Sequence, residues 1–315
     1  MNVMTAAQQM FVIFLLIIVG FLCYKKNLIS EANNACLSKL VINVFNPAMI
    51  FSSVLGNAAA GTKDSIASLF LVSAGIFLFL ILFAKILVHV TRNTPDQKHI
   101  TELLYLFANV GFVGIPVVKA LLGADKLIYA AIFILEYNVL IYTYGIGLLE
   151  TGDTTGKKKR FQLADLKPLL NMGTLACVAT LIVFLTGFTI PGPIADGLQY
   201  LANGTTPVSL LVIGVSLGAQ DSILALFSNW RRYIFCLWKL VLIPLVGTFL
   251  LKRLPISPDM CQTYMIMMAM PCGNLVLMLV KEHGLDGKEC AYTIILSTLL
   301  SILSIPLLVF LYPYL

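Results

Sequence analysis

The chain has 315 residues, a mean hydropathy of +0.93 and a formal net charge of +6, and only 11% of its residues are charged. A soluble domain carries about 25% charged residues, so this composition excludes an ordinary soluble protein. Apolar runs of about 20 residues recur and match the thickness of a bilayer core, which predicts an all-α polytopic membrane protein. The basic residues lie in short loops between these runs, so the positive charge does not indicate a nucleic-acid partner.

Hydropathy predicts about ten transmembrane helices. Their approximate limits are residues 6–24, 35–56, 66–90, 100–121, 127–149, 168–188, 197–218, 231–251, 260–281 and 290–312. The first run lacks a basic start and is followed by lysines, so we interpret it as a span rather than a cleaved signal peptide. A polar linker, residues 151–167, separates a first five-span unit, residues 1–150, from a second, residues 168–315.

The loops also predict an orientation, because cytoplasmic loops of membrane proteins are enriched in Lys and Arg. With the N-terminus outside, thirteen basic residues fall in inner loops and five in outer loops. We therefore expect a multi-pass protein of the cell membrane, with both termini outside and the linker in the cytoplasm.

Similar features recur in the two halves. The pairs are Pro47 with Pro207, Pro116 with Pro271, and Lys85 with Lys239, which are 160, 155 and 154 residues apart. An odd number of spans in each half would insert the second half inverted. Paired, proline-interrupted spans in inverted repeats are typical of secondary transporters and mark their binding site. Chance placement of prolines, of which the chain has 13, is the alternative.

The fourth predicted span contains the stretch LFANVGFVGIPVVKALLG, residues 106–123. Pro116 lacks an N–H and clashes with the preceding turn, so we expect the helix to break just before it. Gly111 and Gly114 allow an extended crossing at low cost. The freed backbone groups cannot face lipid, so they are expected to line a cavity inside the protein. A simple proline kink without a crossing is the alternative reading.

A second interruption is expected in the ninth span, at Pro271 and Gly273. Two helix starts that face each other near the bilayer centre would favour an anion, because N–H groups and the positive end of the helix dipole meet there. Asn109 and Asn274 flank the interruptions, and each amide NH₂ can donate to a carboxylate. Alternatively, each amide satisfies only the backbone freed by its own break.

Several stretches resemble the auxin efflux carrier (PIN-like) family. NVGFVGIP is similar to the fourth span of that family, MAMPCGNLVLMLVKEHG to the ninth, WKLVLIP to the eighth, and IPGPIADGLQYLANGTTPVSLLVIGVSLG to the sixth-to-seventh segment of bacterial members. The resemblance implies ten helices in two inverted repeats, broken crossing helices 4 and 9, and transport of small organic anions such as auxin, malate or malonate. Asn203 and Thr206, in the last of these stretches, complete the predicted substrate-binding set.

Two charged residues lie deep in predicted spans. Glu136 lies about nine residues into span 5 and is the one carboxylate that we place far from any span end. Intramembrane carboxylates are rare, so we predict a role in proton coupling for Glu136, together with Lys239 in span 8. The alternatives for Glu136 are a structural ion pair with Lys239 or a hydrogen bond to a Tyr or Asn. Lys239 could instead attract the anion or brace the helix interface.

The GVSLG segment, residues 214–218, matches the pattern of a hydrolase nucleophile elbow, but it lies inside an apolar run, where small residues four apart pack helices together. No P-loop or metal motif occurs in the sequence, so we expect no enzyme and no cofactor. We predict a secondary carrier that moves a small organic anion across the bilayer by alternating access. H⁺ or Na⁺ coupling and a homodimeric assembly are left open, and a membrane sensor that binds a similar anion is the alternative.

Overall fold

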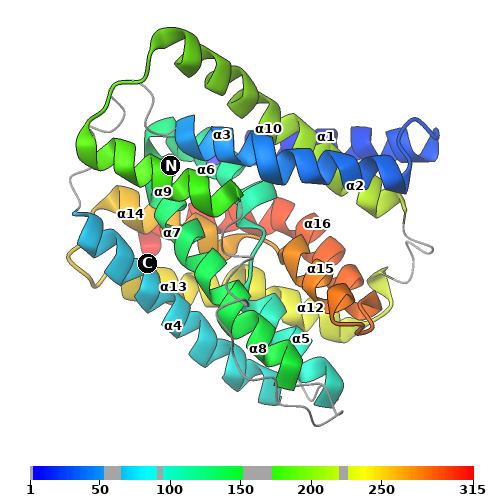
Figure 1. The fold of residues 1–315 in the computed structure, drawn as a ribbon. Helices are drawn as coiled ribbons and strands as arrows, with labels where there is room; N and C mark the ends of the chain where they lie inside the picture. The colour runs from blue at the N-terminus through cyan, green and yellow to red at the C-terminus, as the bar shows by residue number, and fades with distance from the viewer. Residues whose placement is uncertain (1–2, 53–64, 91–94, 152–171, 220–225) are drawn as a thin grey trace.

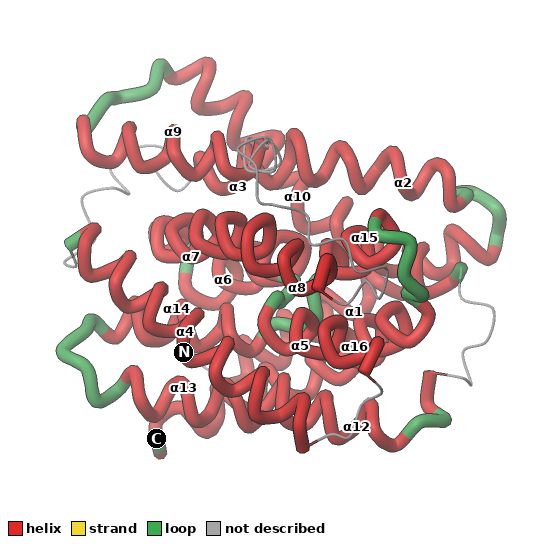
Figure 2. The backbone as a smooth tube through the Cα atoms, turned by 60° about the horizontal axis from the view of Figure 1, so that its bottom comes forward, coloured by secondary structure: helices red, strands yellow, loops and turns green. Residues whose placement is uncertain are grey.

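The computed structural model describes residues 3–52, 65–90, 95–151, 172–219 and 226–315, which form helices and no β-strand (Figure 2). Within these residues, seven helical segments are long and apolar enough to cross a membrane. They are Ala7–Lys25, Glu31–Phe51, Ile66–His89, Ala124–Leu149, Gly192–Gly218, Trp230–Leu251 and Lys288–Tyr314. The predicted class, an all-helical polytopic membrane protein, is therefore confirmed.

The other three predicted spans take different forms. The span predicted at 168–188 is described from residue 172 onward, as the short apolar helix α9 (Met172–Thr186). The spans predicted at 100–121 and 260–281 are interrupted: α5 (Pro95–Leu106) is followed by α6 (Ile115–Leu122), and α14 (Pro258–Ala269) by α15 (Asn274–Glu282). Nearly all of the predicted linker, residues 152–167, lies outside the described residues.

The helices form two groups that pack against each other (Figure 1). The first group contains α1 (Val3–Lys25), α2 (Glu31–Leu40), α3 (Asn46–Phe51), α9 and α10 (Gly192–Gly218). The second contains α4 (Ile66–Val90), α5, α6, α7 (Leu127–Leu140), α8 (Ile146–Thr151), α12 (Trp230–Leu237), α13 (Ile243–Leu251), α14, α15 and α16 (Lys288–Leu311). The two ends of the chain lie on the same side of the molecule in Figure 1.

Helices α1 and α10 form the most extensive helix–helix contact of the described residues. Glycines allow their backbones to approach closely. A Cβ atom on Gly214 would lie 2.8 Å from the Phe21 nitrogen and 2.9 Å from the Gly20 Cα, and a Cβ on Gly218 would lie 3.0 Å from Tyr24. The interpretation of residues 214–218 as a packing motif is therefore confirmed.

Three prolines occupy the second position of a helix that follows a π-helical turn. They are Pro47 after Val41–Phe45, Pro116 after Val110–Gly114, and Pro244 after Trp238–Leu242. A π turn bonds each N–H one residue further back than an α turn does, so it leaves room for a ring that cannot donate. The helix therefore does not break just before Pro116, and that prediction is wrong: the chain is non-helical at residues 107–109 and is helical again from Val110.

A serine of the neighbouring helix compensates for the N–H that Pro116 lacks. In an α-helix the Phe112 carbonyl would accept from the N–H of residue 116. The hydroxyl of Ser209, in α10, lies within donating distance of this carbonyl, at 3.0 Å, and shares its proton with the Thr206 carbonyl of its own helix, at 3.1 Å. The bond joins the first helix group to the interrupted span, and both partners are buried.

We expect Ser209→Ala to lower stability by about 1–3 kcal/mol, because a buried carbonyl would be left without its donor. The measurement is thermal unfolding of the purified protein in detergent. Ser68→Ala is the control, since Ser68 is only partly buried and its hydroxyl donates to the Ser65 carbonyl of its own turn. Equal unfolding midpoints for the two variants would show that the Ser209 bond does not stabilise the fold.

Candidate functional site

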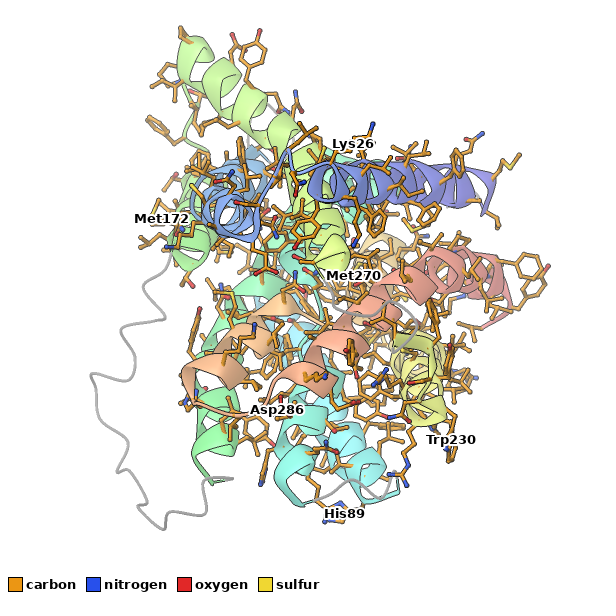
Figure 3. All side chains as sticks on the ribbon, turned by 90° about the vertical axis from the view of Figure 1, so that its right-hand side faces the viewer. Lys26, His89, Met172, Trp230, Met270 and Asp286 are labelled. Atoms are coloured by element: carbon orange, nitrogen blue, oxygen red, sulfur yellow. The ribbon has the colours of Figure 1, made fainter. Side chains whose placement is uncertain are left out.

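The two interrupted spans meet at their breaks. The Asn109 N–H donates to the Pro271 carbonyl at 2.6 Å, and the Gly273 N–H donates to the Phe107 carbonyl at 3.0 Å. Between them, Ala108 and Cys272 pair as an isolated antiparallel bridge. These bonds satisfy backbone groups that would be costly to leave unpaired inside a membrane. Met270, labelled in Figure 3, directly follows α14 as its C-cap residue and lies in the interior of the molecule.

Asn109 is both a helix cap and a free donor. Its side-chain Oδ1 accepts from the Phe112 N–H at 3.2 Å, which starts the helical chain that continues into α6. The capping bond fixes the orientation of the amide, so Nδ2 points away from the helix start. The side chain is 4% exposed, and Nδ2 has no hydrogen-bond partner among the described residues. A buried amide donor without a partner is costly, which indicates a position for a ligand acceptor.

The facing break supplies a second helix start. Gly273 caps α15, and Asn274 is the first residue of that helix. A Cβ on Gly273 would lie 2.9 Å from the Ala108 carbonyl oxygen and 3.1 Å from the Tyr137 hydroxyl, so the tight crossing requires glycine. The first N–H groups of both helix starts are thus near the same point, and helix starts favour negative charge.

A cavity of about 550 Å³ reaches this crossing. Of the predicted site residues, it is lined by Asn109, Gly111, Gly273 and Asn274. Its walls are mainly apolar, and its further polar lining comes from Glu31, Asn34, Ser38, Lys39, Asn46, Tyr137, Asn138, Tyr142, Ser216 and Lys281.

The outer part of the cavity is charged. Glu31, Lys39 and Lys281 line the cavity and are exposed. Glu31 follows the loop that contains Lys26, and Lys281 is itself one of the basic residues that the predicted orientation places at the inner ends of the spans. The cavity therefore opens on the side that the distribution of basic residues predicts to be cytoplasmic.

Other predicted site residues lie away from the cavity. Gly114 packs against Met267 and Met270, and Pro116 is buried in α6. Pro271 contributes its carbonyl to the crossing, and so its role here is in the backbone. The structure does not bring these three side chains into the cavity lining.

Asn203 and Thr206 belong to α10 and do not line the cavity either. Asn203 is exposed and accepts from the Lys119 ammonium at 3.1 Å, and also from the Gln199 amide at 3.0 Å. Its two partners indicate a contact between α6 and α10 rather than a ligand contact.

The charged residues predicted deep in the spans are separate from each other. Glu136 is half-buried in α7, and its Oε2 has no hydrogen-bond partner among the described residues. Lys239 is fully buried and donates to the Tyr105 carbonyl. No ion pair joins the two in the part of the chain that the structure describes. Glu102, in α5, is also buried and accepts from the Tyr144 hydroxyl, so Glu136 is not the one carboxylate inside the helices.

Two amide side chains that line the cavity were not predicted from the sequence. Asn46 is 8% exposed, and its Oδ1 has no hydrogen-bond partner among the described residues. Asn34 donates to Ser216 and to the Val212 carbonyl, which leaves its buried Oδ1 without a partner. For Asn46 a signal existed, because this amide directly precedes Pro47 within an apolar run, and Asn109 also stands before a proline, seven residues ahead of Pro116.

Comparison with known proteins identifies the family. A family model described as "Membrane transport protein" matches residues 5–309. An uncharacterized transporter of Methanocaldococcus jannaschii is 24% identical over 300 residues, which are 94% of this chain and 95% of the relative. An uncharacterized transporter of Methanothermobacter thermautotrophicus is 26% identical over 313 residues, covering 96% and 97%.

A third relative carries a substrate in its name. A Rhizobium meliloti protein named "Putative malonate transporter" is 23% identical over 282 residues, which are 87% of this chain and 86% of that protein. The proteins of this family are transporters and not enzymes. Because the family model covers nearly the whole length, the chain belongs to the membrane transport protein family of the auxin efflux carriers.

Proposed function

We propose that the chain is a secondary carrier that moves small organic anions across the cell membrane by alternating access. The observation that carries this proposal is the free Asn109 Nδ2 donor at a crossing of two broken helices, at the inner end of a 550 Å³ cavity. A donor that is buried and unpartnered fits an acceptor on the transported molecule.

The chemistry of the crossing favours a carboxylate. Two helix starts direct N–H groups and the positive ends of their dipoles to one point, which is how broken membrane helices bind anionic substrate groups. Asn109 and Asn274 would add side-chain donors, as the sequence predicts, with Gly111 and Gly273 allowing close approach. Lys39 and Lys281 at the opening would attract anions from the aqueous side.

The mainly apolar walls favour an acid whose body is uncharged. Malonate, from the name of the Rhizobium relative, and malate are small enough to fit; auxin-like acids would fill more of the cavity with apolar contacts. We take monocarboxylates with apolar bodies and short dicarboxylates as the two substrate classes to compare.

The transport cycle follows from the two groups of helices. We propose ten spans in two inverted five-span repeats, residues 1–150 and 168–315, with both chain ends outside. The group that contains α1, α2, α3, α9 and α10 would form the scaffold, and the group with the crossing would carry the substrate. With this orientation, the cavity of the structure opens to the cytoplasm, so the structure corresponds to an inward-facing state.

The test is uptake of labelled acids into liposomes that contain the purified protein. The panel holds malonate, malate, an indole acid and a branched-chain keto acid, each with and without H⁺ and Na⁺ gradients. Saturable accumulation of at least one acid above empty liposomes supports the proposal. Tight binding of an acid without any flux would instead favour a membrane sensor, and neither binding nor flux would reject both functions.

Glu136 is proposed to carry or gate a coupled proton. Moving a proton with the anion lowers the net charge transferred, and so the cost of about 2.3 kcal/mol per charge per 100 mV. Glu136→Gln keeps the size and removes the titration. We expect this variant to lose the stimulation of uptake by a pH gradient while it retains exchange of labelled for unlabelled substrate in liposomes.

Asp196→Asn is the control for this prediction, because Asp196 is an exposed carboxylate of α10 away from the cavity. It should respond to the pH gradient as the unmodified chain does. A Glu136→Gln variant with the same response would assign Glu136 a purely structural role.

A further inference from the structure

Helix α5 ends at the crossing, and the carbonyls of its last turn have identified partners. The Leu103 carbonyl accepts from the Phe107 N–H at 2.8 Å, and the Leu104 carbonyl lies 3.5 Å from the Cys272 thiol. The Tyr105 carbonyl accepts from the Lys239 ammonium at 2.7 Å. A positive charge of the chain itself therefore lies at the C-terminal end of the broken helix.

The surroundings of Lys239 are closed. The residue is 0% exposed, and it belongs to the π-helical turn of residues 238–242, next to α12 and α13. The rings of Tyr105 and Phe235 lie 4.2 Å apart, centre to centre, and close this region further. No carboxylate pairs with Lys239 among the described residues. The negative end of the α5 dipole and the Tyr105 carbonyl are thus what compensates the ammonium charge.

The C-terminal end of a broken helix is also where other carriers bind a cation from solution. In transporters with broken helices, unwound carbonyls and the C-terminal ends of half-helices coordinate a coupling Na⁺. We propose that Lys239 is a built-in cation at this position, so that the chain transports its anion without a bound Na⁺. The inference rests on the proposed carrier function and names how that function is coupled.

A tethered cation has a different consequence from a bound one. Na⁺ enters and leaves with each cycle and adds its own gradient to the driving force. The Lys239 charge stays with the protein, so it balances the end of α5 in every state and contributes no external gradient. The buried Tyr105 carbonyl and the negative end of the α5 dipole would be costly to leave without a positive partner, and Lys239 compensates both without an ion from the medium.

The first test needs no substrate. Thermal unfolding of the purified protein is measured in NaCl and in choline chloride at equal ionic strength. The unmodified chain should show the same midpoint in both salts. Lys239→Ala empties the site, and its midpoint should rise by about 2 °C or more with Na⁺ or with propylammonium, which replaces the atoms removed, because a cation that binds only the folded state stabilises it.

Lys85→Ala is the matched control, since Lys85 is the counterpart in the first half but is exposed on α4. It should show no cation-specific shift. A Na⁺-specific shift of the unmodified chain would overturn the proposal, and so would a folded Lys239→Ala that no cation stabilises. If the alanine variant does not fold, Lys239→Arg provides the test. This variant keeps a cation at the site, so its unfolding midpoint should remain insensitive to Na⁺.

The second test uses the liposomes and the acid identified with them. Replacing Na⁺ by choline should change uptake by the unmodified chain less than about twofold, whereas Lys239→Ala should lose about tenfold and recover with propylammonium. Uptake that falls several-fold without Na⁺ would overturn the built-in cation while leaving the carrier function intact. Absence of uptake for every acid would reject the carrier function, and the unfolding test would still decide the role of Lys239.

Discussion

Asn109→Asp is expected to weaken binding of the transported anion at least a hundredfold. The aspartate keeps one oxygen in the position that accepts from the Phe112 N–H, so the start of the helix is preserved. It replaces the free Nδ2 donor by a second oxygen. Loss of a hydrogen bond to a charged group costs about 1.5–3 kcal/mol. Repulsion between two negative charges about 4 Å apart adds about 4 kcal/mol at an effective dielectric constant of 20.

Isothermal titration of the purified protein with its acid measures this effect directly. Asn109→Ala, which removes the donor without adding a charge, should lose only about ten- to a hundredfold. Asn43→Asp is the control, because Asn43 is an exposed amide that donates to its own helix and does not line the cavity. An unchanged dissociation constant for Asn109→Asp would show that the anion does not contact this position.

Gly214→Leu is expected to prevent α1 and α10 from packing. The space for a side chain at this position is occupied by backbone atoms of α1, at Ile17, Gly20 and Phe21, and backbone cannot move aside as a side chain can. Overpacking in a core typically costs 1–3 kcal/mol, and displacing a whole helix costs more. We expect most of the variant to be lost as aggregate, as seen by size-exclusion chromatography in mild detergent.

Gly75→Leu provides the matched control. Gly75 lies within α4, and a Cβ there would meet nothing within 4 Å, so the same substitution adds a leucine to an open surface. The control should elute as a single folded species with nearly unchanged yield. If both variants elute alike, the α1–α10 contact is not essential to the fold.

The membrane class and the meeting of the two interrupted spans were predictable from the sequence, since an apolar run that contains Asn109, three glycines and Pro116 has few other solutions. The position of the break within the first interrupted span was not predictable. Local rules put it at the proline, but a π turn and the hydroxyl of Ser209, which comes from a helix about 90 residues away, let the helix continue through Pro116. Such compensation depends on a tertiary neighbour, which single-sequence rules do not include.

The same limit explains why some predicted site residues line the cavity and others do not. Asn203 and Ser216 both belong to α10, and only the packing of that helix determines that Ser216 lines the cavity while Asn203 contacts Lys119. An ion pair between Lys239 and Glu136 was an open alternative, because hydropathy predicts the depth of a residue in a span but not the direction of its side chain. Asn109 was predicted to flank the break, and in the structure it caps the helix that follows the break; its role in binding an anion stays a prediction.

The hydrogen bonds of the crossing also have a consequence for biosynthesis. Asn109 N–H and Phe107 C=O have their partners on Pro271 and Gly273, residues that the ribosome adds more than 160 positions later. While the first half is being inserted, these backbone groups have no native partner, and a break in mid-membrane would have to be held by water or the insertion machinery. The crossing can therefore be completed only after the segment that contains Pro271 and Gly273 has entered the membrane, which places its assembly late in biosynthesis.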